Sequence, residues 1–180
     1  MKRKRVLAVV AVGLVAAVAA GLYWFQPWKL WVNETVQEAL PVAQPTAQPS
    51  AQATESATPA PKEPTVVATG ALISHEHATT GDVRILRAAD GSLVLRLENL
   101  DTSNGPDLRV WLTDAPVLPG KDGWSVFDDG AYVSAGKLKG NKGSQNYTLP
   151  AGTDLAHYSS VTIWCDRFNV SFGAAELAKV

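Results

Sequence analysis

The sequence predicts an all-β domain, an antiparallel β-sandwich or small barrel, that follows one N-terminal transmembrane helix and a disordered linker. Three observations predict this architecture: an uncharged apolar run near the N-terminus, a central stretch rich in Pro, Ala, Gln, Thr and Ser, and a C-terminal part in which apolar and polar residues alternate. We assign residues 1–32 to a cytoplasmic basic tip and membrane anchor, residues 33–64 to the linker and residues 65–180 to the β-domain.

The apolar run extends from Val6 to Phe25 and follows four consecutive basic residues, Lys2 to Arg5. As a helix, a run of this length spans roughly 30 Å, the thickness of the hydrocarbon core of a bilayer. By the positive-inside rule, the basic residues place the N-terminus in the cytoplasm and everything after Trp28 outside. Aromatic residues gather where the helix would leave the membrane, at Tyr23, Trp24, Phe25, Trp28 and Trp31. We therefore expect a single-pass protein of the cell membrane.

A cleaved signal peptide is the alternative interpretation, because Ala17-Val18-Ala19 resembles a small-residue cleavage site. The apolar core of a signal peptide is typically about 7 to 15 residues long, shorter than the run seen here. A lipoprotein anchor requires a cysteine close to the signal, and the only cysteine of the chain is Cys165. A permanent helical anchor is the favoured interpretation.

The stretch from Pro41 to Pro64 has almost no aliphatic content and few charges. It cannot bury enough apolar surface to offset the entropy lost on ordering, so we expect a disordered stalk. Fully extended, such a stalk would reach roughly 75 Å and act as a tether of variable length.

The remaining residues, 65–180, alternate between apolar and polar side chains in short stretches separated by Gly, Asp and Asn turns. This pattern predicts about seven strands and no long helix; the clearest strands lie at 93–98, 108–113, 161–166 and 170–172, with others near 66–73, 83–87, 131–134 and 145–149. The segment carries thirteen acidic and ten basic side chains, a net charge of −3. Without a basic stripe, the composition gives no indication of nucleic-acid binding.

Four ordered motifs resemble the electron-transfer DM-thirteen domain family. They are His77-Ala78-Thr79-Thr80-Gly81, Gly105 to Leu112, Gln145 to Pro150, and Ile163-Trp164-Cys165 continued by Phe172 to Leu177. The resemblance covers about residues 70–177. It implies an all-β domain whose characteristic cysteine acts in redox chemistry, as a thiol or as a ligand of a group such as haem. Because no partner domain is attached here, the resemblance implies a separate redox partner.

Cys165 is the main candidate redox residue, and Trp164 beside it is a candidate electron relay. Cys165 lies in phase with Val161 and Ile163, so the alternative is a small buried hydrophobe, the commoner fate of a free cysteine. The corresponding alternative for Trp164 is a packing or surface aromatic. A neighbouring Arg167 would favour the thiolate and Asp166 would oppose it, so the sequence leaves both readings of the thiol open.

His75 and His77 would point the same way if they lay on a strand, a weak signal for a metal site. We assign no metal: a blue-copper centre usually takes a methionine ligand, and Met1 is the only methionine. The Cys-x-x-Cys-His motif of covalent haem is absent. A non-covalent haem bound by Cys165, with or without His77, is compatible with these residues, and the cofactor is otherwise unknown.

The sequence thus predicts a membrane-anchored extracytoplasmic module for electron transfer, with a membrane and a separate redox or cell-envelope protein as partners. The alternative is a non-catalytic interaction module of the cell envelope in which Cys165 only packs. No nucleophile elbow, phosphate-binding loop or zincin motif indicates another enzyme class.

Overall fold

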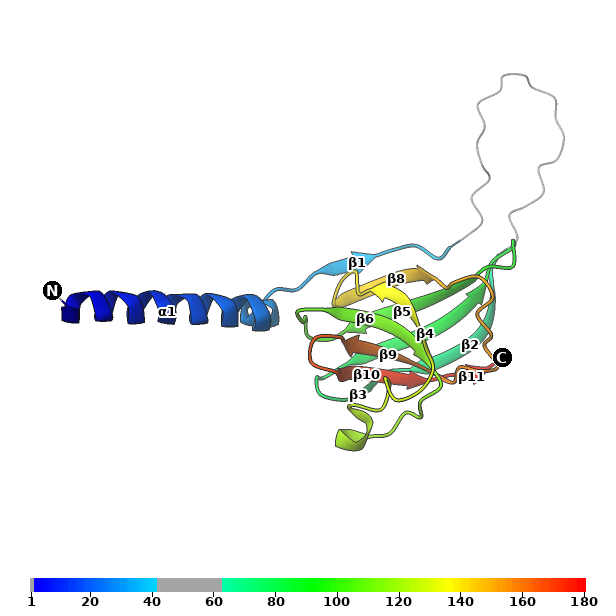
Figure 1. Ribbon diagram of the computed structural model, residues 1–180. Coiled ribbons are helices and arrows are strands. Elements are labelled where there is room, and N and C mark those ends of the chain that lie inside the picture. Colours follow the sequence, from blue (N-terminus) through cyan, green and yellow to red (C-terminus); the bar gives the residue numbers. More distant parts are fainter. Residues whose placement is uncertain (1, 42–62) are drawn as a thin grey trace, which may run out of the picture.

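The computed structural model describes residues 2–41 and 63–180 and shows two β-sheets packed face to face, with one long helix that projects from one end of them (Figure 1). The first sheet has the strand order β1-β8-β5-β4-β2-β11, and the second has the order β3-β10-β9-β6-β7. All described pairings are antiparallel except that of β1 with β8. These two sheets confirm the predicted β-sandwich.

The described elements follow the chain in this order: α1 (Lys2–Phe25), the short 3₁₀ helix η1 (Pro27–Trp31), β1 (Thr35–Gln37), β2 (Thr65–Ala71), β3 (Ile73–Ser74), β4 (Thr80–Arg87), β5 (Leu93–Asp101), β6 (Leu108–Thr113), η2 (Gly120–Gly123), β7 (Tyr132–Lys137), β8 (Lys142–Thr148), β9 (Ser160–Cys165), β10 (Val170–Glu176) and β11 (Ala178–Lys179). Among the described residues after α1, the helices are only four or five residues long, as the sequence predicts.

The main core lies between the two sheets and is built from the alternating positions that the sequence pattern identifies. Its buried members include Leu95 and Leu97 of β5, Val110 of β6, and Ile163 and Cys165 of β9. Alternate residues of a strand point to opposite faces, so one apolar set from each central strand fills this layer. The period-2 pattern therefore determines which face of each central strand is inside.

Strand β1 extends the first sheet with residues that precede the predicted stalk. Thr35, Val36 and Gln37 pair in parallel with Lys142, Gly143 and Ser144 of β8. A side chain at Gly143 would collide with the carbonyl oxygen of Val36, and the φ of Gly143 is +96°, which favours glycine. A glycine at this position therefore allows β1 to approach the edge of the sheet.

Side chains of the domain also hold the segment around β1 in place. The Glu38 carboxylate accepts hydrogen bonds from Lys139 Nζ at 2.8 Å and from the backbone N–H of Asn146 at 2.6 Å. The Lys139 hydrogen bond is the main reason that the pKa of Glu38 lies below its usual range. Arg96 adds hydrogen bonds to the carbonyl oxygens of Glu38 and Ala39.

The predicted disordered stalk, 41–64, falls mainly on residues 42–62, which lie outside the described residues. Strands β1 and β2, on either side of it, belong to the same sheet. The segment therefore joins two strands of one domain. Its length does not set the distance between α1 and the sandwich, which corrects the expectation of a stalk of variable reach.

The C-terminal end of α1 contacts the tip of the β9–β10 hairpin. Arg167 Nη1 donates hydrogen bonds to the carbonyl oxygens of Tyr23 at 3.2 Å and Trp24 at 2.7 Å. The last carbonyl groups of a helix lack intrahelical partners and carry partial negative charge, and α1 has no basic residue in its last turn. Arg167 of the domain supplies the positive charge that the last turn of α1 lacks. The Phe25 and Phe168 rings add a stacked contact, with centroids 5.7 Å apart.

Candidate functional site

Cys165 ends strand β9 inside the core, at the end of the sandwich that contacts α1. Its side chain is 0 % exposed and its position in the ladder is opposite Leu108 of β6 and Val170 of β10. Directly opposed residues of neighbouring strands project to the same face, so these two apolar side chains flank the thiol. The structure thus places Cys165 in the core layer, the location that its phase with Val161 and Ile163 predicts.

Burial raises the pKa of the Cys165 thiol above its ordinary value, because removal from water disfavours the thiolate. The backbone N–H groups of Phe168, Arg167 and Asp107 act in the opposite direction, and the Asp107 charge adds to the increase. The guanidinium of Arg167 is bound to α1, and Asp166 forms an ion pair with Arg109 at 3.1 Å. The opposing effects of the Arg167 and Asp166 charges, which the sequence suggests, are therefore not the causes of the shift in the pKa of this thiol.

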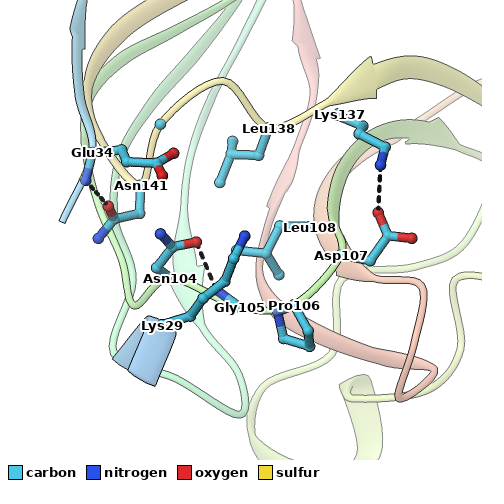
Figure 2. Close-up of a pocket in the computed structure, with 11 residues that line it drawn as sticks. Lys29, Glu34, Asn104, Gly105, Pro106, Asp107, Leu108, Lys137, Leu138 and Asn141 are labelled. Atoms are coloured by element: carbon cyan, nitrogen blue, oxygen red, sulfur yellow. Dashed lines mark hydrogen bonds and ion pairs between the residues drawn. The ribbon is translucent and has the colours of Figure 1, made fainter. Parts of the chain in front are cut away.

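Asp107 lies at a small cavity of about 90 Å³ next to the start of β6 (Figure 2). Its carboxylate is 3.2 Å from Arg109 Nη2 and 3.7 Å from Lys137 Nζ. The loop before it is closed by the Asn104 side chain, which accepts a hydrogen bond from the Gly105 backbone N–H at 2.8 Å. These contacts hold the backbone of Asp107 in place, and the N–H group of that residue lies close to the Cys165 sulfur.

Trp164 points to the other face of β9 and packs in a second buried cluster. The side chain is 0 % exposed and lies with Trp111, Phe127, Ala115 and Ala174, outside the second sheet and beneath the segment that includes η2. Cys165 and Trp164 are thus neighbours in sequence that serve separate clusters on opposite faces of one strand.

A continuous series of aromatic contacts crosses this second cluster. The Trp164 ring stacks on Trp111 with centroids 5.1 Å apart, and Trp111 stacks on Tyr132 at 4.0 Å. On its other side Trp164 meets Phe127 edge-on at 6.3 Å. Because Tyr132 is 46 % exposed, the series links a buried indole beside Cys165 with the protein surface.

Trp111 and Tyr132 are not among the candidate residues that the sequence indicates. Their contact depends on the pairing of β6 with both β9 and β7, which brings Trp111 opposite Thr162 and beside Ser134. The sequence does indicate that Trp111 lies on the face of its strand opposite Val110 and Leu112, and therefore outside the core that those two residues form.

His75 and His77 do not share a strand face, which corrects the expectation of two parallel imidazoles. Both follow β3 in a bend. His75 is buried, and its ring bonds Ser171 Oγ at 2.7 Å and the Leu118 carbonyl oxygen at 3.1 Å. Burial lowers the pKa of His75. Within residues 2–41 and 63–180, no group of three His, Cys, Asp or Glu side chains could hold a metal ion.

His77 lies at a larger cavity between α1 and the sandwich, which we call the helix-end cavity. Its volume is about 460 Å³, and its lining includes Phe25, Leu30, Trp124, Phe168, Val170 and Phe172. The His77 ring packs on Phe172 at 4.0 Å, and its Nε2 is 2.5 Å from Glu76 Oε2. Phe172 also belongs to the core cluster that contains Cys165.

A haem with Cys165 as its iron ligand does not fit this arrangement. Such a ligand needs a sulfur that faces a cavity, whereas Cys165 lies in a filled core and lines neither the helix-end cavity nor the smaller cavity at Asp107. His77 lines the helix-end cavity, but Cys165 does not.

The fold and site define a two-sheet β-sandwich with a single cysteine buried at one end of its core. The family model described as Electron transfer DM13 matches residues 71–177, more than half of the chain. The chain belongs to the electron-transfer DM-thirteen family. Neither the curated proteins nor the solved structures contain a match to this chain.

Proposed function

We propose that this protein is a membrane-anchored, extracytoplasmic electron-transfer module in which Cys165 is the redox group and Trp164 the relay to the surface. Membership of an electron-transfer family supports the redox role. The observation that carries the residue assignment is the position of Cys165, buried beside three backbone N–H groups and next in sequence to the stacked aromatic series. Its partner is a separate redox protein of the cell envelope.

Burial of the thiol favours electron exchange through the packed protein over direct thiol–disulfide exchange. The attacking species in exchange is an accessible thiolate, whereas Cys165 is buried and has a raised pKa. The aromatic series from Trp164 to Tyr132 offers a route that does not require solvent to reach the sulfur. A partner would accept one electron at the Tyr132 surface, which converts the Cys165 thiol to a thiyl radical and releases the thiol proton to the Asp107 carboxylate, whose charge acts on this thiol; return of the electron and the proton restores the thiol.

Substitution of Cys165 by alanine tests the redox assignment. Alanine removes only a small buried volume, so we expect a loss of about 1 to 2 kcal/mol in the free energy of unfolding, and serine should be more damaging because it buries a hydroxyl. The faradaic response of the full chain in a supported bilayer should disappear in Cys165→Ala, whereas the circular dichroism spectrum should persist.

One control variant accompanies Cys165→Ala. Tyr132→Phe, which keeps the ring stack, serves as the control for the aromatic series and should leave the fold intact. An unchanged electrochemical response in a folded Cys165→Ala protein would contradict the redox assignment. The domain would then be assigned as an interaction module in which Cys165 only packs.

The membrane anchor and its orientation form the second part of the proposal. Helix α1 is long and apolar enough to cross a membrane, and none of its described residues is buried in the protein. Four basic residues precede its apolar run, and aromatic residues follow at its end. These features support a permanent anchor with its N-terminus in the cytoplasm over a cleaved signal peptide.

The orientation predicts which part of the chain a protease reaches. Protease added to intact cells or spheroplasts should cut between residues 42 and 62, and a C-terminal tag should then appear on a shorter fragment under denaturing electrophoresis. Full protection of the tag, with cutting only after the membrane is opened, would reverse the orientation. A mature N-terminus at Ala20 would instead establish a cleaved signal peptide.

A further inference from the structure

The turn between β9 and β10, residues 166–169, is a part of the sandwich that contacts the end of α1. Arg167 bonds the carbonyl oxygens of Tyr23 and Trp24, and its guanidinium lies 5.4 Å from the centre of the Trp24 ring. The Phe168 ring stacks on Phe25 with centroids 5.7 Å apart. Figure 1 shows α1 projecting from this end of the sandwich. These contacts hold the turn at one position along the helix.

The contact with Phe25 sets the depth of this turn relative to a bilayer. The apolar run of α1 begins at Val6 and ends at Phe25, and as a helix it spans roughly 30 Å, so Phe25 lies at the outer boundary of the hydrocarbon core. The headgroup layer beyond this boundary is roughly 5 to 8 Å thick on each side of a bilayer. Because the centre of the Phe168 ring is 5.7 Å from that of Phe25, it lies within this layer or at the edge of the hydrocarbon core.

The side chains at this end of the sandwich suit the boundary between lipid and water. Phe168 is 40 % exposed, and η1 has three exposed apolar residues, Trp28, Leu30 and Trp31. Leu30 and Phe168 both line the helix-end cavity, so η1 and the turn form one surface. Exposed aromatic and apolar side chains of this kind are favourable where lipid covers them. Arg167 uses only Nη1 in its described hydrogen bonds, so the other N–H groups of its guanidinium can bind headgroup phosphate.

We propose that η1 and the β9–β10 turn form a membrane-docking surface whose partner is the phospholipid headgroup layer. The described part of α1 is not buried by the protein, and its last apolar residue, Phe25, is also the residue on which Phe168 packs. Lipid around α1 would therefore extend over the turn without a break, and a protein that covered this surface would first have to displace that lipid. The inference rests on the proposed function for the membrane-spanning role of α1 and is independent of the redox role of Cys165.

Photocrosslinking of the full chain in phosphatidylcholine nanodiscs tests this surface. Both faces of a nanodisc are open to solvent, so the result does not depend on the orientation of the protein in the cell. With p-benzoylphenylalanine in place of Phe168, irradiation should attach phosphatidylcholine to the turn, which mass spectrometry of the peptides identifies. The same group in place of Tyr132 is the matched control and should give no lipid adduct. Tyr132 is an exposed aromatic residue opposite Thr113, at the end of β6 that lies away from Cys165.

A second variant tests whether the contact with α1 holds the turn in the headgroup layer. Arg167→Ala removes the hydrogen bonds to the end of α1, so the yield of lipid adduct at position 168 should fall severalfold. Arg87→Ala is its control, because Arg87 is also an exposed arginine that bonds a backbone carbonyl oxygen, that of Gly91, outside α1. It should leave the yield unchanged.

The photoreactive group in place of Phe25 separates failure of this surface from failure of the anchor. Lipid adducts at position 25 but none at position 168 would overturn the docking surface and leave the membrane anchor standing. The absence of lipid adducts at both positions would overturn the two together. Crosslinks from position 168 to another protein instead of lipid, or equal yields in Arg167→Ala and Arg87→Ala, would also overturn the docking surface.

Discussion

Replacing Trp164 with alanine is expected to lower the free energy of unfolding by about 3 to 5 kcal/mol, the range for loss of a large buried aromatic side chain. Trp164 is 0 % exposed and is packed between Trp111 and Phe127. Its removal leaves a cavity lined by rigid rings, which cannot collapse without breaking their own contacts. The midpoint of thermal unfolding, followed by near-ultraviolet circular dichroism, should fall by on the order of 10 °C or more.

Two variants define the cause of that loss. Trp164→Phe retains a ring between the same neighbours and should lose less than half as much stability. Trp31→Ala removes the same side chain from a position that is 78 % exposed and should change the free energy of unfolding by about 0.5 kcal/mol or less. Equal effects of the substitutions at Trp164 and Trp31 would show that the second cluster contributes little to stability.

Replacing Gln145 with leucine is the second change with a large expected effect. The Gln145 side chain is 0 % exposed, and its Oε1 accepts hydrogen bonds from the backbone N–H groups of Lys139 and Gly140 and from the Tyr147 hydroxyl, at 3.1, 3.2 and 2.7 Å. Its Nε2 donates to the Gly140 carbonyl oxygen at 2.8 Å. Leucine leaves these buried groups without this partner, so a loss of about 3 kcal/mol or more is expected.

A double-mutant cycle with Tyr147→Phe checks this explanation by chemical denaturation. The Tyr147 hydroxyl donates to Gln145 Oε1, and both side chains accept from the Lys139 backbone N–H group, so the sum of the two single losses should differ from the loss in the double variant by about 0.5 kcal/mol or more. Thr148→Val, at an exposed position of the same strand, is the control and should be nearly neutral. Additive losses would mean that Gln145 and Tyr147 act independently.

The strands of the sandwich could be predicted from sequence because each central strand presents one apolar face to the core. Leu93, Leu95 and Leu97 show this alternation without interruption, and all three are buried. Strand β1 could not be predicted in the same way. It has only three residues, and its pairing depends on space that Gly143 provides more than a hundred residues later in the chain.

The environment of the candidate site was predictable only in part. The phase of Cys165 with Ile163 indicated a core position, which the structure shows. The residue types near the thiol did not indicate which groups act on it, because Asp107 reaches Cys165 through the pairing of β6 with β9. Similarly, Trp164 is buried by a segment around η2 that lacks strand periodicity, so no repeating pattern in the sequence predicts that this segment covers Trp164.

Because β1 pairs with β8, non-covalent contacts as well as the covalent chain hold the part that carries α1 to the rest of the sandwich. A single cut between residues 42 and 62 would divide the protein into a fragment that carries α1 and β1 and a fragment that carries the other strands of the sandwich. The ladder of β1, the Glu38 contacts and the Arg167 contacts to α1 would still join the two fragments. The protein would then behave as a complemented pair, with the sandwich retained on the fragment that carries α1 until β1 dissociates from the sheet edge.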